Sequence, residues 1–238
     1  MIPLRDDNPT STPPIVTITF IAANVLIFLY QLSLGEEGYK LFALTYGAIP
    51  YELMNSINLP LTPYVPNTVT VLSSIFLHGG LFHLGGNMLY LWIFGNNIED
   101  SMGHIRFIIF YLICGIVAVF AHTFVNINSK LPMIGASGAI SGILGAYLLL
   151  FPRARVVTLV PIGFFIQIIR IPAVIVIGFW IVIQFLSGAM SIGAKGGGVA
   201  YFAHIGGFIS GIILVGLFKK KGVRLFGRRR EVQDAEME

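Results

Sequence analysis

Charged residues are scarce in this chain. Asp, Glu, Lys and Arg make up 11 % of the 238 residues, against roughly 25 % in soluble globular proteins. Hydrophobic residues account for 55 % of the chain, and the mean hydropathy is +0.83. These values exclude an ordinary soluble domain and predict an integral, multi-pass membrane protein of the all-α class.

Cysteine is almost absent. Cys114 is the single cysteine and lies in an apolar run, which excludes a disulfide framework or a thiolate metal cluster within one chain. A metalloprotease built on His78, His83 and His204 is disfavoured, because the chain has no H-E-x-x-H motif and these histidines have no carboxylate partner. We therefore expect no metal and no cofactor.

Two other membrane classes are also disfavoured. The apolar runs hold no pair of aspartates, which an aspartyl intramembrane protease requires. A transporter or channel favours charged or ion-coordinating groups at mid-membrane, and the runs offer few beyond Asn24 and Gln184.

A basic excess is present but is concentrated at one place. The formal charge of +4 comes mostly from "KKKGVRLFGRRR", which directly follows the last apolar run. Such a cluster is typical of the cytoplasmic flank of a membrane span. We therefore expect the lipid bilayer, and not a nucleic acid, to be the partner of this chain.

Six apolar segments are candidates for membrane spans, because about 20 residues are needed to cross roughly 30 Å of hydrocarbon. We place them at Ile15–Leu34, Leu81–Ile98, Ile105–Asn126, Ser137–Phe151, Pro172–Met190 and Ala203–Phe218. This predicts a six-transmembrane-helix bundle with a cytoplasmic segment at 1–14, a membrane domain at 15–218 and a charged cytoplasmic tail at 219–238.

One further apolar run does not fit a span. Val156–Ile169 is broken by Pro161 and Gly163 and is followed by Arg170. As a helix of about 14 residues it would reach only ~21 Å. We predict that it lies at the cytoplasmic interface.

The distribution of lysine and arginine predicts the orientation. With the N-terminus inside, the inner segments hold most of these residues, and the outer segments hold only Lys40, Lys130 and Lys195. Cytoplasmic segments carry an excess of Lys and Arg. Both termini are therefore expected in the cytoplasm.

This orientation brings four polar residues to one depth near the outer face. Ser137 opens the fourth span, His204 opens the sixth, and His83 and Asn87 begin the second. A lone serine among glycines is most often a packing residue, and a lone interfacial histidine an anchor. Their coincidence at one level favours a functional site.

Small residues recur at intervals of four beside two of these groups. Gly138 and Gly142 follow Ser137 in "IGASGAISG", and Gly207 and Gly211 follow His204 in "AHIGGFISG". Such stripes let helix backbones approach closely. A close approach would bring the serine hydroxyl within hydrogen-bond distance of the histidine, as nucleophilic catalysis requires.

Donors for an oxyanion are present as well. His83 and Asn87 in "HLGGN" stand at i and i+4, on one face of a helix. The backbone N–H of Ser137, at a helix start, is a third donor. Because no Asp or Glu lies near these groups, a Ser–His dyad fits better than a triad.

Together, "HGGLFHLGGN", "GASG" and "AHIGG" resemble the motifs of the rhomboid family of intramembrane serine proteases. The resemblance implies Ser137 as nucleophile, His204 as general base, and His83 and Asn87 in the oxyanion hole. The substrate would be a membrane-spanning protein cleaved near its outer end. The six-span bacterial and archaeal type is the most similar, which implies a prokaryotic plasma membrane. A catalytically inactive relative would lack Ser137 or His204.

Two positions depart from the family pattern. Some members carry an aromatic residue four positions after the nucleophile that stacks on the histidine, and this chain has Ser141 there. The Trp-Arg pair of some first loops is also missing, since the only tryptophans are Trp92 and Trp180. The resemblance therefore does not identify the group that orients His204.

Overall fold

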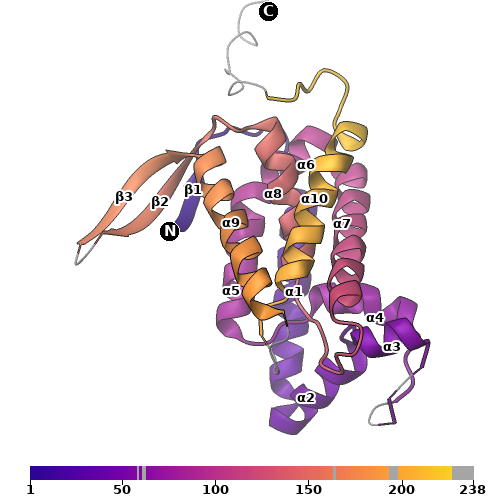
Figure 1. Ribbon diagram of the computed structural model, residues 1–238. Coiled ribbons are helices and arrows are strands. Elements are labelled where there is room, and N and C mark those ends of the chain that lie inside the picture. Colours follow the sequence, from indigo (N-terminus) through magenta and orange to yellow (C-terminus); the bar gives the residue numbers. More distant parts are fainter. Residues whose placement is uncertain (58, 61–62, 163–164, 193–197, 227–238) are drawn as a thin grey trace, which may run out of the picture.

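The computed structural model describes residues 1–57, 59–60, 63–162, 165–192 and 198–226, and most of them are helical (Figure 1). This confirms the predicted helical membrane bundle. The helices are α1 (Ile15–Ser33), α2 (Gly35–Tyr46), α3 (Pro50–Asn55), α4 (Asn67–Ser73), α5 (Leu81–Tyr90), α6 (Asn96–Met102), α7 (His104–Val125), α8 (Ser137–Leu150), α9 (Ala173–Ser191) and α10 (Tyr201–Phe218).

The long helices match the expected spans closely. α1, α7, α9 and α10 begin and end within two residues of the predicted boundaries, and each is long and apolar enough to cross a membrane. α8 is shorter, at 14 residues. The second expected span is helical from Leu81 to Met102, through α5, the π-helical turn η2 (Leu91–Gly95) and α6. It is bent by 82° from the segment Asn67–Phe76, which ends in the 3-10 turn η1 (Ser74–Phe76).

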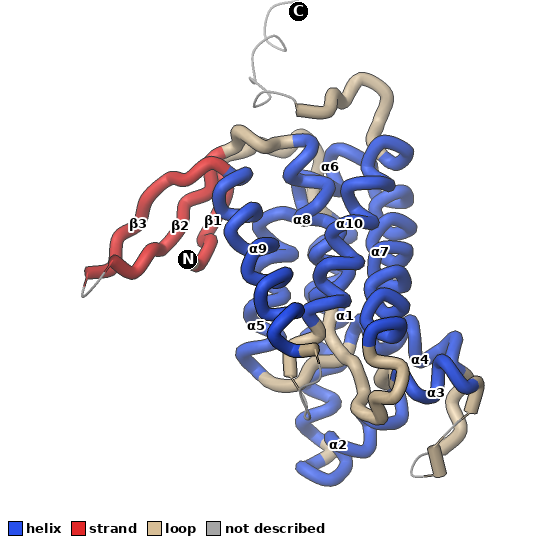
Figure 2. The backbone as a smooth tube through the Cα atoms, in the orientation of Figure 1, coloured by secondary structure: helices blue, strands red, loops and turns tan. Residues whose placement is uncertain are grey.

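The described residues of Val156–Ile169 are extended and not helical, and the location of this run at the cytoplasmic interface stays a prediction. This run forms a β-hairpin of β2 (Arg155–Ile162) and β3 (Phe165–Pro172), and β1 (Ile2–Asp6) pairs antiparallel with β2. Figure 2 shows this sheet beside the helical bundle. The apolar residues of this run show no periodicity that separates helix from strand, and its β-branched residues favour the strand.

The segment before α1 packs on the bundle. The Glu99 carboxylate accepts the backbone N–H groups of Val16 and Thr17, both at 2.8 Å. These two N–H groups belong to the first turn of α1, where a helix supplies no backbone acceptor, so Glu99 supplies one. Ser11 and Thr12 donate their hydroxyl groups to Asp100 at 2.9 Å and 2.8 Å. These bonds fix residues 11–17 to α6.

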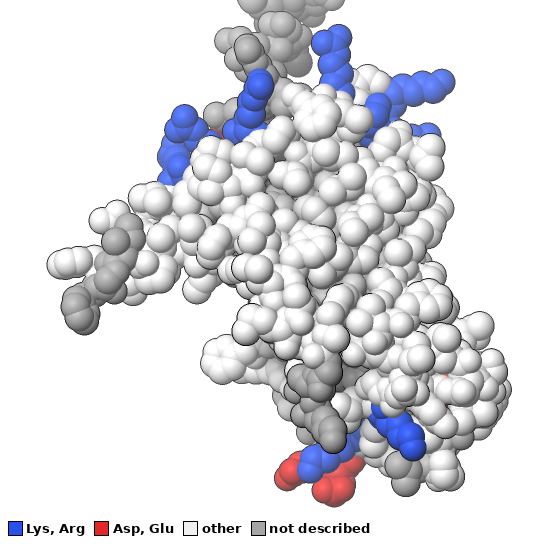
Figure 3. Space-filling view, in the orientation of Figure 1, with Lys and Arg blue, Asp and Glu red and all other residues white. Residues whose placement is uncertain are grey.

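Basic side chains gather at one end of the bundle, where α7 begins, α8 ends, α9 begins and α10 ends. Arg106, Arg153 and Lys219 lie at or just beyond these helix ends, and Arg170 lies on β3, three residues before α9 begins. Figure 3 shows this basic end opposite a smaller group of charged side chains. The bundle is thus polarised along its axis.

Glycines bring α10 and α8 into backbone contact. A Cβ on Gly207 would overlap the carbonyl oxygen of Gly138, and a Cβ on Gly211 would overlap that of Gly142. Cβ atoms on Gly138 and Gly142 themselves would lie 2.5 Å from the Cβ atoms of Ala118 and Cys114, both of α7. The two stripes therefore make different contacts. The α10 glycines let α10 approach the backbone of α8, whereas the α8 glycines mainly let α7 approach α8.

Candidate active site

Ser137 is the first residue of α8 and follows a backbone position that favours glycine. Gly135 has φ +134°, a conformation that L residues rarely adopt. A Cβ there would lie 2.8 Å from Nε2 of His83 and 3.6 Å from Oγ of Ser137. The chain can therefore pass between these two side chains only with glycine at residue 135.

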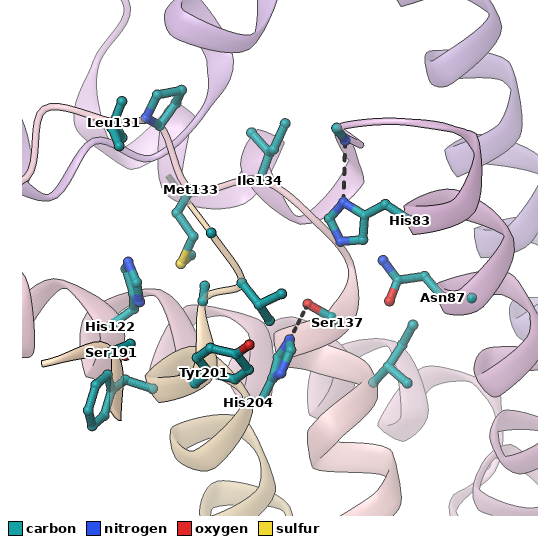
Figure 4. A pocket seen from close by; sticks show the side chains of 18 of the residues that line it. His83, Asn87, His122, Leu131, Met133, Ile134, Ser137, Ser191, Tyr201 and His204 are labelled. Carbon is teal, nitrogen blue, oxygen red and sulfur yellow. Dashed lines mark hydrogen bonds between the residues drawn. The ribbon is translucent and has the colours of Figure 1, made fainter. Parts of the chain in front are cut away.

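His204 lies in the first turn of α10 and faces Ser137 (Figure 4). Its Nε2 is 2.8 Å from Oγ of Ser137, within hydrogen-bond distance. The imidazole is buried, with 8 % of the residue exposed. The contact depends on the close packing of α10 against α8.

The opposite nitrogen of His204 has a partner that the sequence analysis did not assign to the site. Nδ1 of His204 is 2.8 Å from Oε1 of Gln184 on α9. Trp180, one turn earlier on α9, places its ring centroid 5.7 Å from that of His204, with an angle of 36° between the planes. Trp180 and Gln184 are four residues apart and so share one face of α9, which was a possible sequence signal for a common site. Nothing in the sequence, however, linked α9 to the histidine.

Ser141 does not contact the imidazole through its hydroxyl. Its Oγ donates to the carbonyl of Ser137 at 2.6 Å, within the same helix. The aromatic neighbour of His204 is therefore Trp180, from a different helix than the resemblance suggested.

His83 and Asn87 come from one face of α5 and point toward the Ser137 region (Figure 4). The N–H of Gly79 donates to Nδ1 of His83 at 3.3 Å. This leaves the proton on Nε2, which can donate. The amide nitrogen of Asn87 lies 3.0 Å from Nε2 of His78. His78, considered in the sequence analysis only as a metal ligand, thus fixes the Asn87 side chain.

These groups line one cavity of about 850 Å³. α5 contributes Phe82, His83 and Asn87 to its wall, α9 contributes Trp180, and α10 contributes His204. The wall combines a few polar groups with apolar side chains, as small-molecule and peptide sites do.

The arrangement has the parts of a nucleophilic site. It contains a hydroxyl, a base within hydrogen-bond distance, and side-chain and backbone N–H donors. Within residues 1–57, 59–60, 63–162, 165–192 and 198–226, no three His, Cys, Asp or Glu side chains are grouped so that they could hold a metal ion.

Comparison with known proteins identifies relatives. Residues 66–221 match the family model described as "Rhomboid domain". Rhomboid protein 1, mitochondrial, of Saccharomyces cerevisiae is 30 % identical over 175 residues, covering 70 % of this chain and 46 % of the relative. Rhomboid protease GluP of Bacillus subtilis is 33 % identical over 159 residues, covering 67 % and 28 %.

RHOMBOID-like protein 1 of Arabidopsis thaliana is 28 % identical over 167 residues, covering 70 % of this chain and 39 % of the relative. The chain therefore spans less than half the length of these curated relatives. The matched segment contains α5 and α7–α10, and with them the serine, both histidines of the site and the asparagine. On this evidence, the chain belongs to the rhomboid family.

Proposed function

We propose that this protein is an intramembrane serine protease that cleaves peptide bonds in or near the outer end of membrane-spanning helices. The observation that carries the proposal is the distance of 2.8 Å between Oγ of Ser137 and Nε2 of His204, inside a cavity large enough for a peptide segment. Membership of the rhomboid family supports the reaction class.

Acylation begins when Nε2 of His204 accepts the hydroxyl proton of Ser137 and Oγ attacks the substrate carbonyl carbon. A C–O bond forms, and the carbonyl π electrons move to the oxygen. The tetrahedral intermediate then collapses, its C–N bond breaks, and Nε2–H gives its proton to the leaving amine. Water, deprotonated by the same nitrogen, hydrolyses the acyl-enzyme and returns the proton to Ser137.

The oxyanion is stabilised by donors of three kinds. The side chains of His83 and Asn87 lie beside the Ser137 region, with Nε2–H of His83 able to donate and one N–H of the Asn87 amide left over beside the contact of its nitrogen with His78. The N–H of Ser137, at the start of α8, has no acceptor within the helix. The dipole of α8 favours negative charge at the same position. Donors already in place need no reorganisation as charge develops.

The substrate is proposed to be a single-pass or other transmembrane protein. Its helix must unwind locally, because a peptide bond inside a helix does not offer its carbonyl to a nucleophile. The polarised bundle supports an orientation with both termini in the cytoplasm and the site toward the outer face. Location in a prokaryotic plasma membrane stays a proposal, because the relatives include mitochondrial as well as bacterial proteins.

Cleavage of a model transmembrane substrate by purified protein in proteoliposomes tests the proposal. Mass spectrometry should locate the cut near the outer end of the substrate helix. The Ser137→Ala variant should give no product, and Ser33→Ala, an exposed serine that bonds to its own helix at the end of α1, should cleave like the native protein. Equal cleavage by Ser137→Ala would overturn the assignment.

A further inference from the structure

Gln184 is the polar partner of His204 on the side away from the serine. Its residue is 7 % exposed, and its Oε1 lies 2.8 Å from Nδ1 of the imidazole. A histidine with two partners can be fixed in one tautomer, because the proton on one nitrogen decides the role of the other. The tautomer of His204 therefore depends on whether the oxygen or the nitrogen of the Gln184 amide faces Nδ1.

The carbonyl of Trp180 settles this orientation. Nε2 of Gln184 donates to that carbonyl at 3.1 Å. In the flipped amide, Oε1 would face the carbonyl oxygen, and two acceptors would be left without a proton between them. The amide oxygen must therefore face His204, and Nδ1 of His204 must carry the proton.

The position of this proton determines what Nε2 of His204 presents to Ser137. With the proton on Nδ1, the lone pair of Nε2 points at Oγ of Ser137, 2.8 Å away. This is the tautomer that a general base needs. The Trp180 ring packs beside the imidazole and limits its rotation. One turn of α9 thus fixes both the tautomer and the ring.

We infer that Gln184 is a positioning residue that holds His204 in its base-competent tautomer, as a neutral counterpart of a triad carboxylate. The inference rests on the proposed function. Because an amide carries no charge, it orients the ring but stabilises the imidazolium less than a carboxylate would. Among the residues that the structure describes, His83 on α5 and His122 on α7 are the titratable groups of other helices that interact electrostatically with His204.

Two variants separate positioning from packing. Gln184→Met has similar length but cannot accept the Nδ1 proton, and we expect kcat to fall about tenfold with little change in KM, the effect of losing one hydrogen bond. Gln184→Glu keeps an acceptor, so activity should be retained at alkaline pH. Its carboxylate would stabilise the charged imidazole, so the acid limb of the rate profile should move to higher pH.

If Gln184 contributed to packing alone, the two variants would behave differently. If Gln184→Met kept full kcat, or if Gln184→Glu left the acid limb unmoved, the inference would be wrong even though the native protein cleaves. Native protein that fails to cleave contradicts the proposed function itself, and the inference falls with it. Thermal unfolding of each variant in detergent shows whether the loss comes from misfolding.

A second inference concerns the hairpin of β2 and β3. Between Arg155 and Arg170 the sequence holds no charged residue. Near the turn, Phe165 is 75 % exposed and Ile166 is 69 % exposed, and they lie on opposite faces of β3. Exposed apolar side chains of this size indicate an apolar partner.

The position of the hairpin identifies that partner. In Figure 1 strands β2 and β3 leave the bundle sideways, and they run alongside α9 instead of projecting beyond the bundle end. The lipid-facing candidates of α9, such as Ile175 and Phe179, are themselves exposed and apolar. At the base of the hairpin, Arg153 and Arg155 are exposed, as basic residues at a membrane surface are.

We propose that this hairpin lies in the bilayer, at the boundary between headgroups and acyl chains on the basic side of the bundle. It would anchor the start of α9 and the N-terminal strand β1, which pairs with β2. The unpaired edge of β3 favours this depth over the hydrocarbon core, where lipid-exposed backbone groups find no partners.

Spin labels in proteoliposomes test the anchor. Labels on Phe165→Cys and Ile166→Cys should be more accessible to oxygen than to a water-soluble nickel complex, and a label on Arg153→Cys should show the reverse. Native Cys114 is buried, so it gives little background. Nickel access at residue 166 equal to that at residue 153 would contradict the proposal. Spin–spin broadening that disappears on dilution with unlabelled protein would instead indicate a second copy of the chain, and would also contradict it.

Discussion

Gly207 of α10 lies directly against the backbone of Gly138 of α8, so that any Cβ at residue 207 would overlap the Gly138 carbonyl oxygen. Gly138 follows the candidate nucleophile, and His204 stands one turn before Gly207 on α10. The separation of these two helices therefore sets the separation of Ser137 and His204.

Gly207→Val should lower the cleavage rate far more than stability. A valine would push α10 away from α8 and move His204 out of reach of Ser137. A displacement of about 1 Å can reduce the rate ~10²-fold, while overpacking typically costs ~1–3 kcal/mol. Gly216→Val is the matched control, because a Cβ at Gly216 meets no atom within 4 Å. Full activity of Gly207→Val would show that the close packing is not needed.

Asn87→Ala tests the oxyanion donors. We expect turnover to fall by about 10²–10³ with little change in KM, the loss typical of removing one such donor. Asn126→Ala is a suitable control, since Asn126 lines the same cavity but donates to the His122 carbonyl of its own helix. Unchanged turnover of Asn87→Ala would remove Asn87 from the mechanism.

The orientation predicts which side of the membrane each loop faces. Lys130→Cys, in the exposed loop after α7, should react with an impermeant thiol reagent added outside cells. Arg153→Cys, at the basic end, should react only after the membrane is opened. Native Cys114 is buried and should not interfere. The reverse pattern of labelling would overturn the topology.

Asp6 makes stability depend on pH. Burial raises its pKa to about 6 from 3.8, partly opposed by the hydrogen bond that the Tyr147 hydroxyl donates at 2.6 Å. Between pH 3.8 and about pH 6, Asp6 keeps its proton in the folded protein but releases it in the unfolded chain. The free energy of unfolding therefore falls as the pH rises through this range. The contribution is at most about 3 kcal/mol.

Asp6→Asn should remove this dependence. Unfolding temperatures in detergent at pH 4.5 and pH 7.5 check it, since the native protein should lose more stability across the interval than the variant. Identical changes in both proteins would show that Asp6 does not titrate there.

Much of the helical arrangement could be predicted because the length of an apolar run limits where a span begins and ends. α7 and α9 each begin and end within one residue of the expected bounds. The hairpin could not be predicted, because Val156–Ile169 is apolar without periodicity and its partner β1 lies about 150 residues away.

The candidate site was only partly predictable. Ser137, His204, His83 and Asn87 stand beside glycines or share a helix face, and the structure brings them together in one cavity. Gln184 looked like an isolated polar residue at mid-span. Only the folded bundle brings its amide to His204, through the packing of α9 beside α10. His78 was missed as a partner of Asn87 for the same reason.

The central claim is that Ser137 is a nucleophile activated by His204. Reaction of the purified protein with a fluorophosphonate probe, followed by mass spectrometry of the labelled peptide, tests it most directly. The account predicts labelling of Ser137 in the native protein and in Ser191→Ala, which removes another serine of the same cavity. It predicts no labelling in Ser137→Ala or His204→Ala. Labelling that persists in Ser137→Ala, or that maps to another serine, would contradict it.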